Sequence, residues 1–220
     1  MAINSVHLIP GECISTDQLE SNMPGRIPNM KGKHSASHYH TPTLFADHAS
    51  RYINVSLHIS TGAQEVTDAK LKFKREAKEK AMIIREYQAD NGVYQSKLFK
   101  ASCDTLDQKM TFCRVNMHHQ NGIAEQQVCM LTECARTMLI HAMYCWPELA
   151  TAELWPFMLK MAVDIHNAMP TETGISLEEV FTGRKSRNRL EDYHTFSCPV
   201  FMLEAALQQG NKIPKWILRS

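Results

Sequence analysis

QKMTFCRVNMHHQNGIAEQQVCMLTECAR, residues 108–136, contains the most informative pattern in this chain. It starts with a short strand-like run, passes through a polar loop and enters a long helical pattern at Gly122. Residues three and four apart share a helix face, which gives a first stripe of Glu125, Cys129, Thr132 and Arg136. A second stripe is apolar and predicted to face the core: Leu131, Cys134, Ala135, Met138, Leu139 and Ala142. Glu125 is therefore expected outside the buried face.

Two further acids stand near the predicted ends of strands. Asp17 lies late in the strand-like run 11–19, and Asp90 follows the run 82–87. Each acid alone has an ordinary structural explanation, because a first-turn Glu suits the helix dipole and Asp-Asn-Gly is common turn chemistry. The occurrence of all three, in the order strand, strand end and helix, favours a shared site instead.

This order, with Asp90 and Glu125 separated by 35 positions, resembles the DDE pattern of retroviral-type integrases. The segments are still more similar to the integrase core of copia-type retrotransposons, in which DNG is followed by HHQNGIAE and then by a helix ending ARTML. The matching segments here are residues 90–92, 118–125 and 135–139. The resemblance extends over about residues 11–198, and the block 118–125 is its most specific part.

The resemblance implies an α/β fold of the RNase H-like type, and the strand and helix patterns support it independently. Its five-stranded mixed sheet has three antiparallel strands, then two parallel strands, and is flanked by helices. Strands are predicted at residues 11–19, 43–47, 52–59, 82–87 and 109–113. Helices are predicted at residues 64–80 and 95–103, from residue 122 onward, and at 151–167. A crossover through the first of these helices would bring Asp17 next to Asp90.

For the site, the resemblance implies that Asp17, Asp90 and Glu125 are the catalytic residues and hold two Mg²⁺ (or Mn²⁺) ions. Phosphodiester cleavage develops charge on the attacking and the leaving oxygen, and two metal ions stabilise both. Magnesium prefers oxygen ligands, which carboxylates supply. Water would be the nucleophile for 3′-end processing, and a DNA 3′-hydroxyl for strand transfer. Clustered carboxylates repel one another, so at least one should have a raised pKa without metal.

The resemblance implies DNA as the partner, both the element ends and the target DNA. It also implies a homo-oligomer, because retroviral-type cores often bury a dimer interface in the region of the helix at 151–167. The predicted DNA contacts are polar or basic residues: Asn91, Asn116, His118, His119, Gln120, Asn121, Arg136, Arg184, Lys185 and Arg187. A solvated loop or linker explains the residues around 116–120 and the basic run 183–189 equally well. If the chain is a DNA-processing core, its net charge of +1 predicts that most non-specific DNA affinity comes from segments outside this sequence.

The 220 residues suit one large domain, or one domain with a tail. Residues 1–10 are predicted to be a lead-in, 11–170 the catalytic core, and 171–220 an extension that enters a following module, as in a fragment. The seven cysteines are odd in number and form no CxxC pair, which favours free thiols and an intracellular protein, nuclear or cytoplasmic. No apolar run approaches the length of a membrane span, so no membrane association is expected.

Two competing site assignments are considered. Asp47 also follows strand-like residues, but the resemblance assigns the first catalytic position to Asp17. Zinc is suggested by three histidines in the loop 21–42, namely His34, His38 and His40. No Cys pair follows them at ligand spacing, so a solvated hairpin loop is the better interpretation.

Two departures from the family bear on activity. Residues 126–129 are Gln, Gln, Val and Cys where the family usually has basic residues, and Arg114 stands where glycine is common. The second hypothesis is therefore a catalytically decayed or domesticated copy that binds DNA or protein. A structure-selective nuclease of the same fold is the third hypothesis, because it would share the acids but not the block 118–125.

Overall fold

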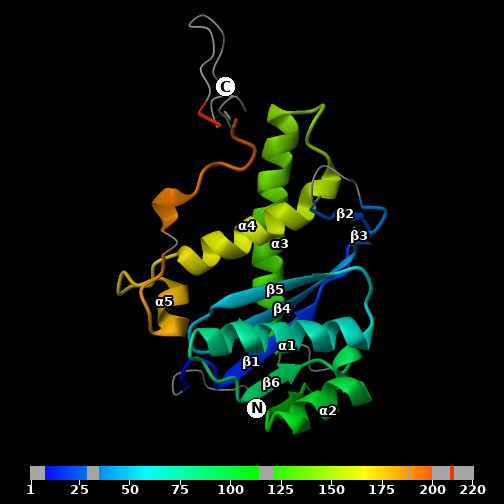
Figure 1. Cartoon of the computed structure of the whole chain (residues 1–220), viewed down its shortest axis with the longest axis vertical. Helices are drawn as coiled ribbons and strands as arrows, with labels where there is room; N and C mark the ends of the chain where they lie inside the picture. The colour runs from blue at the N-terminus through cyan, green and yellow to red at the C-terminus, as the bar shows by residue number, and fades with distance from the viewer. Residues whose placement is uncertain (1–7, 29–34, 114–120, 188, 200–208, 211–220) are drawn as a thin grey trace, which may run out of the picture.

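A five-stranded mixed sheet lies at the centre of the computed structural model, which describes residues 8–28, 35–113, 121–187, 189–199 and 209–210 (Figure 1). Its strands are β1 (Cys13–Gln18), β4 (Thr41–Asp47), β5 (Ile53–His58), β6 (Glu86–Ala89) and β7 (Lys109–Phe112), in the order β5-β4-β1-β6-β7. β4 pairs antiparallel with both β1 and β5. β6 pairs parallel with both β1 and β7. The predicted three antiparallel and two parallel strands are therefore confirmed.

The register between β1 and β6 decides where two of the acids lie. Thr16 pairs with Ala89, so Asp17 and Asp90 occupy the next positions along the two strands. Because the strands are parallel, both acids lie at the same edge of the sheet. The crossover predicted from sequence is present, and it passes through α1 (Ala63–Glu79).

Helices cover both faces of the sheet (Figure 1). They are α1, η2 (Val93–Gln95), α2 (Lys97–Thr105), α3 (Gly122–Cys145), η4 (Ala152–Leu154), α4 (Trp155–Ala168), α5 (Leu177–Thr182) and η5 (Leu190–Asp192). One core cluster joins the sheet to α1, α2 and α5, and a second joins it to α3 and α4. Phe45 of β4 belongs to the first cluster and its neighbours Leu44 and Ala46 to the second, because successive strand side chains alternate between faces.

Aromatic rings dominate the layer that contains α1 and α5. Phe45 stacks on Phe73 with ring centroids 5.1 Å apart, and Tyr52 stacks on Phe181 at 4.4 Å. Full burial of one such side chain contributes roughly 1.5–3 kcal/mol. Phe181 is 1% exposed, so the core includes a residue from the region 171–220.

Two details of the strands differ from the sequence prediction. The strand expected at 82–87 begins only at Glu86, because the N–H of Met82 donates to the carbonyl of Ala77 and so extends the end of α1. The loop expected at 21–42 contains a small antiparallel sheet of β2 (Gly25–Arg26) and β3 (His38–Tyr39).

The core-facing stripe of α3 is confirmed with one exception. Leu131, Ala135 and Ala142 are buried, and Met138 and Leu139 are partly buried against the same cluster. Cys134 is exposed, so the prediction of a core position was wrong there. In the described part of the chain, no helix combines the length and the apolarity needed to cross a membrane.

Candidate active site

Asp17 lies near the end of β1 and is partly buried. Its Oδ1 accepts a hydrogen bond from the backbone N–H of Gln18 at 2.8 Å. Burial raises the pKa of Asp17 to about 6; this hydrogen bond opposes the rise, and the charges of Asp90 and Glu125 add to it. One of the three acids therefore has the predicted raised pKa, although burial contributes more to it than repulsion.

Asp90 follows the last residue of β6 and is exposed. Its Oδ1 accepts a hydrogen bond from the backbone N–H of Gly92 at 3.2 Å, which closes a turn of the kind expected for Asp-Asn-Gly. A Cβ at position 92 would lie 3.3 Å from that same oxygen. The glycine therefore leaves room for the carboxylate to fold back over the turn.

Glu125 lies in the first turn of α3 and is exposed. At the N-cap position of this helix, Asn121 donates from Nδ2 to the carbonyl oxygen of Thr16 at 3.4 Å. This bond connects the start of α3 to the residue that precedes Asp17. It explains why the charge of Glu125, one helical turn further on, raises the pKa of Asp17.

Cys113, the residue after β7, lies close enough to the three acids for their charges to affect its thiol. Burial raises the pKa of Cys113, a hydrogen bond with Gln88 lowers it, and the charges of Asp90, Glu125 and Asp17 raise it. Three acids far apart in sequence therefore act on one buried group. These three acids lie on β1, directly after β6 and in the first turn of α3.

The three carboxylates form an all-oxygen donor set, which suits Mg²⁺ or Mn²⁺ chemically. Within the described ranges, no three His, Cys, Asp or Glu side chains are gathered closely enough to hold a metal ion as they stand. Mutual repulsion favours separation of carboxylates when no cation lies between them. Joint coordination therefore requires movement of these side chains, and those of Asp90 and Glu125 are exposed.

The predicted DNA contacts fall into three groups. Asn116, His118, His119 and Gln120 lie outside the described residues. Among the predicted contacts that the structure describes, four basic side chains are exposed: Arg136, Arg184, Lys185 and Arg187. Arg136 lies along a groove of about 440 Å³ that Leu19 and Trp155 also line. Asn91 and Asn121 instead form hydrogen bonds within the protein, and Asn121 is 2% exposed.

Asp47, the competing first acid, has a structural role at the opposite edge of the sheet. It pairs with Ile14 at the start of β1, and it is fully buried. Its carboxylate accepts hydrogen bonds from the N–H of Gly11 at 2.8 Å and from the N–H and Oγ of Ser50, both at 2.7 Å. These bonds satisfy Asp47 within the turn after β4, so the choice of Asp17 is consistent with the geometry.

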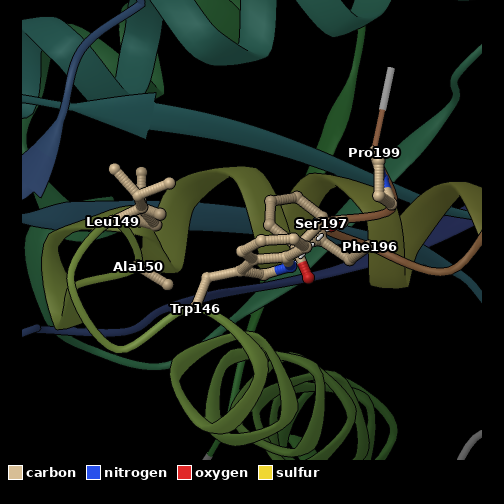
Figure 2. A pocket seen from close by; sticks show the side chains of 7 residues that line it. Trp146, Leu149, Ala150, Phe196, Ser197 and Pro199 are labelled. Atoms are coloured by element: carbon tan, nitrogen blue, oxygen red, sulfur yellow. Dashed lines mark hydrogen bonds between the residues drawn. The ribbon is translucent and has the colours of Figure 1, made fainter. Parts of the chain in front are cut away.

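An apolar pocket of about 290 Å³ lies beside the C-terminal end of α3, away from the acids near its N-terminal end. Figure 2 shows Trp146 directed toward Ser197 and Phe196, and its Nε1 donates to the carbonyl of Ser197 at 2.9 Å. The bond ties residues 196–199 to the end of α3. The pocket shares no residue with the carboxylate cluster.

Sequence reasoning identified the acids but not the groups that support them. Tyr94 is buried beside the site and accepts a hydrogen bond from Thr16 Oγ1 at 3.1 Å, and burial raises its pKa. The sequence signal that could have indicated its burial is an aromatic residue within the mostly polar segment 90–96. The internal bonds of Asn91 and Asn121 had no sequence signal beyond their places in turns.

Comparisons with solved structures support the fold. The HTLV-2 integrase catalytic core domain in complex with magnesium, in its dimeric and its trimeric form, matches with a TM-score of 0.54 and 15% identity over 79% of this chain and 98% of that chain. The simian T-cell lymphotropic virus intasome in complex with PP2A regulatory subunit B56 gamma matches with a TM-score of 0.57 and 15% identity over 90% of this chain.

The chain spans about 60% of the matched intasome chain. No family model matches the sequence, and no curated protein matches it. The structural matches, together with the strand order and directions, show that this chain has the RNase H-like fold of retroviral integrase catalytic cores.

Proposed function

We propose that this chain is the integrase catalytic core of a copia-type LTR retrotransposon. Its reaction would be metal-dependent 3′-end processing of element DNA, followed by strand transfer into target DNA. The observation that supports this most directly is geometric: Asp17 and Asp90 follow the paired residues Thr16 and Ala89 of two parallel strands, and Asn121 bonds the start of α3, which carries Glu125, to Thr16. A shared fold alone would not require three acids there.

In the proposed site, Asp17 would contribute an oxygen ligand to both metal ions. Asp90 and Glu125, both exposed, would each bind one of these ions. Two Mg²⁺ or Mn²⁺ ions would supply stabilisation of charge on the attacking and leaving oxygens of the phosphodiester. The protein supplies the carboxylates and orients them, with Asp17 held by the N–H of Gln18 and Asp90 by the N–H of Gly92.

The protonation state of Asp17 matters for this proposal. A carboxylate must lose its proton to bind a metal ion. With a pKa of about 6, Asp17 is mostly ionised at neutral pH but partly protonated just below it. Metal binding and activity should therefore weaken between about pH 7 and pH 5.

The proposed DNA contacts are the exposed basic side chains together with Asn116, His118, His119 and Gln120, which lie outside the described residues. Arg184, Lys185 and Arg187 follow α5, and Arg136 lies on α3. Their positive charge suits phosphate groups, although the net charge of +1 leaves little general affinity for DNA. A homo-oligomer that acts inside the cell, where element DNA and target DNA meet, completes the proposal.

A strand-transfer assay with labelled element-end DNA and Mg²⁺ tests the function. Glu125→Gln and Asp90→Asn should each reduce joining by at least about 100-fold, because each removes a charged metal ligand without changing side-chain size. Matched controls are Glu79→Gln on α1 and Asp104→Asn on α2, both at exposed positions. Joining that persists in either site variant would refute the assignment.

A catalytically decayed copy is the second candidate. It is favoured by Gln126 and Gln127 in place of basic residues, and by the absence of a preformed three-ligand metal group among the described residues. Calorimetric titration with Mn²⁺ distinguishes the two candidates. An active core releases or absorbs heat saturably, and the Glu125→Gln variant does so less, whereas a decayed site gives no saturable heat in either protein.

A further inference from the structure

At the end of the β6–β7 ladder, a side-chain hydrogen bond from Asn91 takes the position of the next backbone hydrogen bond. The N–H of Cys113 donates to the carbonyl of Ala89 at 3.0 Å, which is the last backbone rung between the two strands. In a parallel ladder the next rung would run from the N–H of residue 91 to the carbonyl of Cys113. That carbonyl instead accepts a hydrogen bond from Nδ2 of Asn91 at 3.0 Å.

Because the side chain of Asn91 makes this bond, the main chain can leave the sheet directly after Asp90. The side chain of Asn91 keeps the end of β7 bonded, while the backbone turns so that the N–H of Gly92 reaches Asp90 Oδ1 at 3.2 Å. A buried carbonyl without a partner is costly, so the turn needs a donor at this position. Asn91 supplies it from the residue adjacent to the catalytic acid.

The other end of the same amide is held as well. Oδ1 of Asn91 accepts a hydrogen bond from Nε2 of Gln95, the last residue of η2, at 2.6 Å. The amide therefore has a donor on one side and an acceptor on the other, which fixes its orientation. Asn91 thus joins β6, β7 and η2 around the turn that presents Asp90.

We propose that Asn91 is a positioning residue for Asp90, in place of the DNA contact expected from the sequence. Its amide fixes the turn that sets where the Asp90 carboxylate meets a metal ion, and Gln95 orients that amide. The inference rests on the proposed function, because it assigns Asn91 a role in a metal-binding site. Partners that orient a metal ligand typically change metal affinity by 10–100-fold when removed.

The test compares metal affinity with DNA affinity in variants of the full chain. Mn²⁺ binding is measured by calorimetry without DNA, and DNA binding is measured by fluorescence anisotropy in EDTA. Asn91→Ala should weaken Mn²⁺ binding by about tenfold or more and leave metal-free DNA binding within about twofold. Gln95→Ala, which keeps the bond to Cys113, should weaken Mn²⁺ binding in the same direction by a smaller factor.

A matched control is Gln64→Ala on α1, which removes a similar exposed bond from Gln64 Nε2 to Asp68 Oδ1 at 3.0 Å. Its Mn²⁺ affinity should equal that of the wild type. If Asn91→Ala does not fold, as judged by thermal unfolding in EDTA, the Gln95→Ala result decides alone.

The failure of this inference differs from the failure of the proposed function. Wild-type Mn²⁺ affinity in Asn91→Ala, with weakened DNA binding, would make Asn91 a DNA contact and overturn the positioning role. Wild-type values for both would overturn it too. A wild-type chain that neither binds Mn²⁺ nor joins DNA would refute the proposed function itself, and this inference with it.

Discussion

Asp17 is a partly buried acid whose ionised form is unfavourable in the metal-free protein. Burial raises its pKa from 3.8 to about 6, and the charges of Asp90 and Glu125 add to this effect. The folded protein therefore keeps this proton at pH values where the unfolded chain has already lost it. Because the folded state binds the extra proton, this contribution to stability falls as the pH rises from about 4 to about 6.

The first residue-scale prediction follows from that sign. Asp17→Asn should increase the free energy of unfolding in EDTA at pH 7.5 by about 1–3 kcal/mol, because it removes the unfavourable charge and keeps an acceptor for the N–H of Gln18. The gain should shrink as the pH falls and approach zero near about pH 3, where wild-type Asp17 is protonated in both the folded and the unfolded state. Urea unfolding at the two pH values measures it.

The exposed Asp104→Asn variant serves as the control for this experiment, and its free energy of unfolding should change by less than about 0.5 kcal/mol. Saturating Mn²⁺ should reverse the ranking by stabilising the wild type more than Asp17→Asn. A loss of stability in Asp17→Asn at pH 7.5 would show that the ionised carboxylate is favourable in the metal-free fold. The assignment of Asp17 to a strained acidic cluster would then be wrong.

Metal-binding chemistry limits which residue types can serve as ligands, so the sequence offers candidates for that role. The role of a supporting residue such as Asn91 depends on three-dimensional contacts and was harder to predict. Asp17, Asp90 and Glu125 were assigned through the family resemblance, with support from their places near strand ends and at a helix start, and their catalytic roles stay predictions. Asn91 was predicted to contact DNA because a polar residue in a turn usually faces solvent. Its bond to Cys113, 22 residues away in the sequence, depends on the register of β6 and β7, which no local pattern encodes.

At the scale of elements, α5 is a short helix that depends on its ends and its contacts. Ser176 Oγ accepts from the N–H of Glu179 at 3.2 Å, and Glu179 accepts from the N–H of Ser176 at 3.0 Å, which forms a capping box. Gly183 ends the helix with a positive φ of 63°. Glu178 bonds Lys80 at the end of α1 at 2.7 Å.

The element-scale prediction concerns that cap. Ser176→Ala should lower the free energy of unfolding by about 1 kcal/mol, because it leaves the N–H of Glu179 without its acceptor. Thermal or urea unfolding measures the change, and Ser60→Ala in an exposed turn is the control, with an expected change below about 0.5 kcal/mol. An equal effect of both substitutions would show that the capping box contributes no specific stability.

Elements with a strong period were predictable, and elements defined by pairing were less so. The helix 64–80 was predicted within a residue at each end because its apolar positions repeat at helical spacing. The strand at 82–87 was placed too early, since Met82 is apolar yet bonds back to α1. The two-residue strands β2 and β3 are too short to have a pattern, and they are defined only by their pairing with each other.

At the scale of the whole molecule, strand order follows from a few connections. The tight turn between β4 and β5 requires an antiparallel pair, and a helical crossover requires β6 to run parallel to β1. These constraints supported the sheet architecture that the family resemblance implied. The distribution of helices over its two faces required the structure, because the amphipathic pattern of α3 does not specify which face of the sheet it covers.

The whole molecule brings the ends of three distant elements to one edge of the sheet, where their acids act on each other and on Cys113. The central claim is that these acids bind metal ions together. A crystal structure of the wild-type chain with Mn²⁺, analysed by anomalous scattering, tests it most directly. The account predicts Mn²⁺ peaks within coordination distance of the carboxylates of Asp17, Asp90 and Glu125. Mn²⁺ bound elsewhere, or an ion contacting one acid while the other two point away from it, would contradict the account.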